Sequence, residues 1–147
     1  MRFNPINLFG LAIVAVMLIP NIAYAVRRRS GTEQSGGGRK LLCWFEQVGR
    51  YGSMILMAVP VMVGEFGFAG VTAFLIYAVG NTVLLLAYLV AWGLYFKKVC
   101  RGKELVLAVL PTCIFLLSGI TLRHWLLVAT AILFGVGHIY TVLRSAD

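Results

Sequence analysis

The chain contains five stretches that are long and apolar enough to cross a lipid bilayer as α-helices. A helix needs about 20 predominantly apolar residues to span the hydrocarbon core. Such stretches occupy residues 5–26, 43–63, 71–96, 105–122 and 125–143. Only 12% of the residues are charged, about half the share of a soluble domain. Because a water-soluble fold of 147 residues could not hide so much apolar surface, we predict an all-α, polytopic membrane protein with a single domain, residues 1–147.

The second stretch differs from the others because it contains two charged residues, Glu46 and Arg50. A helix that began after Arg50 would have only 13 residues before Gly64, which is too short to cross the core. Unsatisfied backbone groups in lipid cost several kcal/mol each, more than a compensating pair of charges near the interface. We therefore predict that this span begins at Cys43 and includes both charges.

The basic residues are divided unequally between the two sides that these spans define. Of the 13 Lys and Arg residues, only Arg2 and Arg123 fall on the side of the N-terminus. The other side holds Arg27, Arg28, Arg29, Arg39, Lys40, Arg50, Lys97, Lys98, Arg101, Lys103 and Arg144. Short cytoplasmic loops carry the excess of Lys and Arg, so we expect the N-terminus outside and the C-terminus in the cytoplasm. The compact chain and its short loops favour the cytoplasmic membrane of a bacterium.

The first span has an alternative interpretation as a cleaved signal peptide. Arg2, the apolar run 8–19 and the Ala23-Tyr24-Ala25 sequence together match that pattern. Cleavage would invert the four remaining spans and place most of the basic residues outside, against the charge rule. We therefore predict that the first span is retained as a membrane anchor.

A polar segment at 27–40 connects the first two spans. Its centre, 30–38, is rich in Gly and Ser and is typical of a flexible linker. Its basic residues could lie on anionic lipid headgroups, each contributing about 1 kcal/mol. These residues are Arg27, Arg28, Arg29, Arg39 and Lys40. The alternative is a loop that fixes the topology and has no partner.

Glu46 and Arg50 form the strongest candidate for a functional pair, because ionisable residues inside a membrane are rare and commonly functional. Four residues apart, they lie on the same face of a helix, with the acid in the favourable N-terminal position. Gly49 and Ser53 share this face. A small and polar face of this kind is expected to turn toward other helices. The alternative is a neutralised pair that anchors the span at the interface.

Further polar residues lie at a similar depth in the cytoplasmic leaflet. A cluster of Asn21, Glu46, Arg50, Tyr88 and His138 is allowed by depth, although the rotation of each helix is not fixed by the sequence. Such a cluster could bind an anionic head group or relay a proton, since His titrates near neutrality. The alternative for a single membrane histidine is a hydrogen-bonded packing role.

Two other features predict contacts between helices. Asn81 lies near the centre of the third span, where an amide needs a partner and commonly joins two helices. A substrate-orienting role is the alternative for Asn81. Ala131 and Gly135 form a small-xxx-small pair on the fifth span, a pattern that permits close packing of a neighbouring helix.

Several kinds of chemistry find no support in the sequence. His124 and His138 are 14 residues apart, about 21 Å along one helix, so they cannot share a metal ion. No catalytic or nucleotide-binding motif is present, so we predict neither a cofactor nor a metal. Cys43, Cys100 and Cys113 have no metal-binding spacing. The basic residues occur in short runs beside apolar spans, which argues against nucleic-acid binding.

Three classes of function remain. We favour a non-catalytic membrane protein that associates through its helices with itself or a partner, because Gly- and Ala-rich faces are present and catalytic motifs are not. The second class is an oligomeric transporter of a small solute or lipid, with a polar site in its cytoplasmic half. The oligomer is invoked because five short helices leave little room for a pathway in one chain. The third is a membrane enzyme that uses Glu46, Arg50 and His138.

Overall fold

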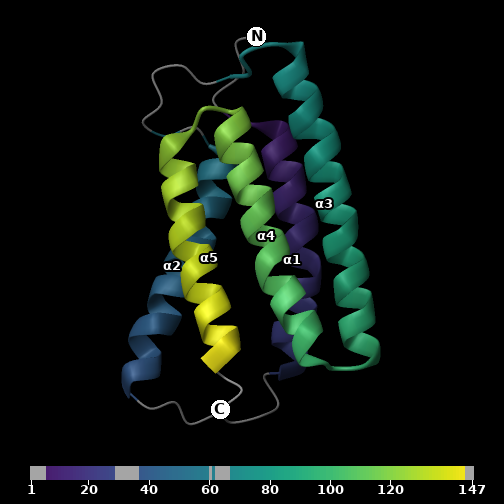
Figure 1. Cartoon of the computed structure of the whole chain (residues 1–147), viewed down its shortest axis with the longest axis vertical. Coiled ribbons are helices and arrows are strands. Elements are labelled where there is room, and N and C mark those ends of the chain that lie inside the picture. The colour runs from purple at the N-terminus through teal and green to yellow at the C-terminus, as the bar shows by residue number, and fades with distance from the viewer. Residues whose placement is uncertain (1–5, 29–36, 60, 62–66, 145–147) are drawn as a thin grey trace.

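The structure, a computed structural model, describes residues 6–28, 37–59, 61 and 67–144. Within these residues the chain forms five α-helices and no strand: α1 (Leu8–Arg28), α2 (Gly37–Ala58), α3 (Val71–Lys97), α4 (Arg101–Thr121) and α5 (Trp125–Arg144). Successive helices run in opposite directions along one bundle, so α1 begins at one end of the bundle and α5 ends at the other (Figure 1). The prediction of an all-α fold is confirmed.

Four of the described helices, α1, α3, α4 and α5, are long and apolar enough to cross a membrane. The bounds of α3 and α5 each agree with the predicted spans to within one residue. The outer surface of these helices is strongly apolar: Val71, Trp125 and Leu8 are 74%, 72% and 70% exposed. Surfaces of this kind need lipid to cover them. The chain is therefore a multi-span helical membrane protein.

The second helix departs from the predicted span 43–63. It begins at Gly37 and ends at Ala58, so its first turn occupies part of the predicted linker 27–40. Its end is explained by Pro60, because the residue before a proline disfavours the α conformation. With Arg39, Lys40, Glu46 and Arg50 inside it, α2 is not among the four apolar helices.

The fourth helix also begins earlier than predicted, at Arg101 instead of Leu105. Glu104 lies in its first turn, where a negative charge is favourable at the positive end of the helix dipole. The Nζ atom of Lys103 donates to the carbonyl oxygens of Leu94 and Lys98, both at 2.9 Å. Lys103 therefore satisfies carbonyl groups at the end of α3 and ties that end to the start of α4.

The turn between α4 and α5 is a Schellman motif. The His124 N–H donates to the carbonyl of Gly119 at 2.8 Å, and the Arg123 N–H donates to that of Ile120 at 3.2 Å. Arg123 has a φ of 56°, the left-handed conformation that this motif requires. The short turn makes α4 and α5 the antiparallel hairpin that the sequence predicts.

Small residues let the helices approach one another closely. A Cβ atom added at Gly49 would lie 3.0 Å from the Cα atom of Phe134, and one added at Gly135 would lie 2.5 Å from Cγ2 of Thr112. The Ser53 hydroxyl donates to Oγ1 of Thr130 at 3.2 Å. The small face of α2 therefore packs against α5, and α5 packs against α4. Both contacts confirm the helix-packing predictions.

Candidate functional site

A cavity of about 680 Å³ lies between the five helices, in the half of the bundle where α1, α3 and α5 end. Its polar lining comes from different helices: Asn21 and Tyr24 from α1, Glu46, Gln47 and Arg50 from α2, Tyr88, Trp92 and Tyr95 from α3, Glu104 from α4, and His138 and Thr141 from α5. Met17, Met54, Phe115 and Phe134 supply apolar surface. The cavity is of the size that holds a small organic molecule, since such sites measure about 300–1,000 Å³.

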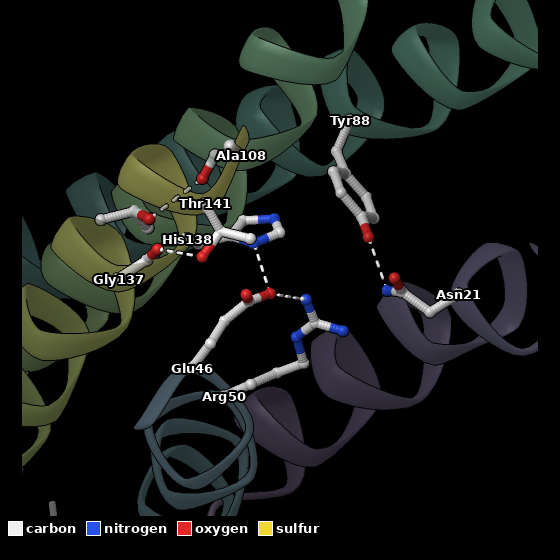
Figure 2. Close-up of polar contacts among 9 residues, drawn as sticks. Asn21, Glu46, Arg50, Tyr88, Ala108, Gly137, His138 and Thr141 are labelled. Carbon is white, nitrogen blue, oxygen red and sulfur yellow. Dashed lines mark hydrogen bonds and ion pairs between the residues drawn. The ribbon is translucent and has the colours of Figure 1, made fainter. Parts of the chain in front are cut away.

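Glu46, Arg50 and His138 form the charged centre of the cavity, and we call them the triad. One carboxylate oxygen, Oε1 of Glu46, lies 2.8 Å from Nη2 of Arg50 and 2.5 Å from Nδ1 of His138. The side chains are 10%, 22% and 19% exposed, respectively. Figure 2 shows the Glu46 carboxylate reaching between the other two groups. The contact with His138 is a charged ion pair only when the imidazole is protonated.

The close packing of α2 against α5 brings the triad together. Gly49 lies against the backbone of Phe134, and a Cβ atom at Gly137 would lie 3.9 Å from the Cα atom of Glu46. His138 is one turn beyond Phe134 and therefore faces Glu46 across this contact. Its ring stacks on that of Phe134 with centroids 5.1 Å apart, while Cζ of Arg50 lies 5.7 Å from the Phe134 centroid. The Phe134 ring therefore contacts both the imidazole of His138 and the guanidinium of Arg50.

Asn21 and Tyr88 form a second polar pair in the cavity, between α1 and α3. The Asn21 Nδ2 atom donates to the Tyr88 hydroxyl at 2.6 Å and to the Met17 carbonyl at 2.8 Å. Figure 2 shows this pair facing the side of Arg50 that is turned away from Glu46. The structure therefore brings Asn21, Glu46, Arg50, Tyr88 and His138 to one cavity, as their depths allowed.

Asn81, the remaining candidate binding residue, lies outside this cavity. It is fully buried, and its Oδ1 atom accepts a hydrogen bond from the Ser118 hydroxyl at 3.3 Å. At the end of the bundle where α1 begins, the Asn7 side chain donates to the Met57 carbonyl and to the Tyr77 hydroxyl, both at 3.3 Å. Asn81 therefore joins α3 to α4, the helix-bridging role that was the first of its two alternatives.

Of the five candidate lipid-contacting residues, four lie in helices: two at the end of α1 and two at the start of α2. Arg27 lies in α1 with Cζ 4.9 Å from the Phe96 ring centroid. Arg28 ends α1, and Arg39 and Lys40 lie in the first turn of α2; the side chains of these three lie outside the described part, as does all of Arg29.

The sequence prediction missed six polar residues of the cavity lining: Tyr24, Gln47, Trp92, Tyr95, Glu104 and Thr141. The Tyr95 hydroxyl donates to Oε1 of Glu104 at 3.0 Å, and the rings of Tyr24, Trp92 and Tyr95 pack together with centroids 5.5–5.9 Å apart. Tyr88, Trp92 and Tyr95 recur at helical spacing on α3, the signal that would have placed them on one inward face.

A basic rim surrounds the end of the bundle that is nearest the cavity. The described basic side chains there are Arg27, Lys97, Lys98, Arg101, Lys103 and Arg144. Among the described side chains at this end, Glu104 is the single acidic one outside the triad. A rim of one charge sign raises the local concentration of ions of the opposite sign.

His124, the other histidine, has a structural role at the far end of the bundle. Its Nδ1 atom accepts a hydrogen bond from the Leu127 N–H at 3.1 Å, which caps the start of α5. The imidazole is fully buried in the turn, and burial lowers the pKa of His124 below its ordinary value of 6.5.

This lowered pKa predicts acid sensitivity. The folded state holds His124 neutral, so its contribution to stability is fully present above pH 6.5 and is lost as the pH falls through the lowered folded-state pKa. Replacing His124 with asparagine, which can cap a helix without titrating, is expected to reduce the drop in thermal midpoint between pH 7.5 and pH 5. An equal drop in both proteins would contradict this assignment.

Among the described residues, no three His, Cys, Asp or Glu side chains gather closely enough to hold a metal ion. Cys100 and Cys113 are free thiols. No protein-family model, curated protein or solved structure matches this chain.

Proposed function

We propose that this protein is a five-span membrane carrier whose cavity binds a small organic solute. The observation that supports this most directly is the cavity of about 680 Å³ with the triad at its centre. Placing three ionisable side chains in a cavity within the membrane costs free energy, and such residues commonly mark solute or ion pathways. The cavity lies within one chain, so the spatial argument for an oligomeric pathway no longer applies.

The proposal includes α2 as the fifth span, although its composition is mixed. Its exposed side chains form an apolar stripe at helical spacing: Trp44, Val48, Tyr51 and Ile55 are 65%, 50%, 57% and 60% exposed. Glu46 and Ser53, on the other face, are buried. A helix with apolar residues outside and polar residues inside suits lipid rather than water.

The orientation of the bundle follows from the charge rule. The basic rim marks the cytoplasmic side, so the C-terminus lies in the cytoplasm and the cavity faces the cell interior. A solute would then enter from the cytoplasm. The bacterial cytoplasmic membrane is the location that we propose.

The other two function classes lose part of their support. The small residues that favoured association with another chain, Gly49, Ala131 and Gly135, are used for packing within this chain. An enzyme would need a reacting group beside the triad. No Ser or Cys is found among the described residues that line the cavity, and the hydroxyl of the lining residue Thr141, a group that can act as a nucleophile, donates to the Gly137 carbonyl at 2.8 Å.

Filling the cavity tests this function. Ala23 and Ala25 are both exposed residues of α1, but Ala25 borders the cavity and Ala23 is not among its lining residues. The protein in lipid nanodiscs would be incubated with the small-molecule fraction of a cell extract, washed and analysed by native mass spectrometry. We expect wild type and Ala23→Trp to retain the same small molecule and Ala25→Trp to lose at least 90% of it. Equal retention by all three proteins, or no retention by wild type, would refute the proposal.

A further inference from the structure

The triad changes its total charge when it takes up one proton. With Glu46 ionised, Arg50 protonated and His138 neutral, the three groups sum to zero. One added proton gives a total of +1, whether it resides on the Glu46 carboxylate or on the His138 imidazole, which meet at Oε1 of Glu46. The triad side chains are between 10% and 22% exposed, so a net charge there is only partly compensated by water.

Arg50 has donors to offer besides the one that Glu46 uses. A guanidinium group carries five N–H donors in a planar fork that matches a carboxylate or phosphate, and Nη2 contacts Oε1 of Glu46. Figure 2 shows the rest of the guanidinium group on the side of Asn21 and Tyr88. The Tyr88 oxygen accepts from Asn21, so its own proton can be donated to an anion in the cavity.

We propose that the solute bound in this cavity is a small organic anion, and that it binds against Arg50 together with one proton. This inference rests on the proposed function and names its substrate class. The proton neutralises the Glu46–His138 pair, which releases the Arg50 guanidinium, and the anion takes the place of the Glu46 charge. The sum of the charges in the site then returns to zero. By linkage, proton uptake and anion uptake strengthen each other by the same factor.

The other ionisable groups of the cavity leave this charge balance in place. Tyr24 from α1 and Tyr88 and Tyr95 from α3 contribute phenol hydroxyl groups, which carry no charge at physiological pH. Glu104 from α4 is engaged by the Tyr95 hydroxyl. It lies in the first turn of α4 together with Arg101 and Lys103 of the basic rim. The rim itself attracts anions toward this end of the bundle.

The remaining lining describes the body of the solute. Trp92, Tyr95, Phe115 and Phe134 surround the polar groups with aromatic surface. Such surface favours an apolar ring or chain attached to the anionic group. The site is therefore built for an amphipathic anion of drug-like size rather than for a bare inorganic ion.

Trp92 provides a signal from inside the cavity. The sequence has three tryptophans; Trp44 and Trp125 are 65% and 72% exposed on the outer surface. A Trp44→Phe, Trp125→Phe background leaves Trp92 as the single tryptophan, which excitation at about 295 nm addresses without the tyrosines. The probes are cyclohexanecarboxylate, cyclohexanecarboxamide and cyclohexylmethylammonium, which share a ring and differ in charge. Each would be titrated against the protein in detergent micelles at pH 6.0 and pH 8.0, at constant ionic strength.

We expect the carboxylate to bind at least fivefold more tightly at pH 6.0 than at pH 8.0, and more tightly at pH 6.0 than either other probe. Glu46→Gln, His138→Gln removes both groups that can take up the proton, so the carboxylate affinity of this variant is expected to vary less than twofold between the two pH values. Glu104→Gln, a matched loss of a carboxylate from the same cavity, is expected to keep the wild-type pH dependence.

Removing the cation is the complementary test. Arg50→Gln is expected to lose carboxylate binding and keep amide binding. If that variant does not fold, the double variant Glu46→Gln, Arg50→Gln, neutral at both positions, must show the same loss. Tighter binding of the ammonium probe, a pH effect below fivefold in wild type, or an equal change in Glu104→Gln and in Glu46→Gln, His138→Gln would overturn the inference.

The two proposals fail in different ways. Binding of the amide or ammonium probe without the carboxylate would refute the anion and leave the solute cavity standing. Absence of a fluorescence change with all three probes would also refute the proposal that the solute is an organic anion. The Ala25→Trp comparison decides the cavity itself, because it does not depend on the charge of the solute.

Discussion

Replacing Gly10 with alanine is expected to lower the free energy of unfolding by about 3 kcal/mol, the upper part of the range for overpacked sites. The new Cβ atom would collide with the carbonyl oxygen of Met57 and lie 3.1 Å from its carbonyl carbon. Because these are backbone atoms of α2, no side-chain rotation relieves the collision. The α1 helix would have to move away, which would break the 2.8 Å hydrogen bond from the Asn7 N–H to the Ala58 carbonyl.

Equilibrium unfolding in mixed micelles, followed by helical circular dichroism, measures this effect. Gly93→Ala is the matched control, because a Cβ atom at Gly93 meets nothing within 4 Å. Alanine is also the better helix former by about 1 kcal/mol, so the control is expected to be neutral or slightly stabilised. Equal stabilities of the two variants would show that Gly10 of α1 does not pack against the Met57 backbone of α2.

The second large effect is expected from Glu46→Leu, with a loss of about 2–4 kcal/mol in the free energy of unfolding. Removing one partner of a buried ion pair costs about 3–5 kcal/mol, and this figure is reduced here because the Arg50 side chain is 22% exposed. The cost arises from Arg50, which would keep its charge without the carboxylate. The same unfolding assay reports it.

A double variant separates charge from packing. Glu46→Leu, Arg50→Leu leaves no charge uncompensated, and apolar replacements of both partners are often close to neutral. We therefore expect the double variant to recover most of the lost stability. A double variant as unstable as Glu46→Leu alone would mean that packing around Glu46, rather than the pairing, accounts for the loss.

The helices of this protein are predictable from its sequence because their lengths are set by the bilayer. Apolar runs interrupted by basic residues located α3 and α5 to within one residue. The same rule was weaker for α2, where Glu46 and Arg50 dilute the apolar signal and Pro60 ends the helix before the predicted bound. At the C-terminal end of α2 the conformational restriction imposed by proline therefore sets the helix bound, although the apolar sequence continues beyond it.

Depth in the membrane is also readable from sequence, but helix rotation is not. The polar residues Asn21, Glu46, Tyr88 and His138 were expected at one depth, and they line one cavity. Their meeting depends on Gly49, whose missing side chain lets α2 reach the Phe134 backbone. Such a contact joins residues 85 positions apart in the chain, and no local periodicity encodes it.

The cavity residues that the sequence prediction missed also meet through contacts between helices that local sequence patterns do not encode. Tyr95 and Glu104 lie at the ends of their helices, where aromatic and charged residues are usual at the membrane interface. Their position gave no reason to expect a shared role. The 3.0 Å hydrogen bond between them forms because the short α3–α4 connection brings the two helix ends together.

The outward apolar stripe of α2 has a consequence for how the chain is assembled. Its inward groups, Glu46 and Ser53, contact His138 and Thr130 on α5, which is synthesised after the other four described helices. Until then the Glu46 carboxylate has only Arg50 of its own helix as a partner, and two charges entering lipid on one helix would be unfavourable. We therefore expect α2 to wait at the membrane surface or beside the insertion machinery until α5 has been synthesised.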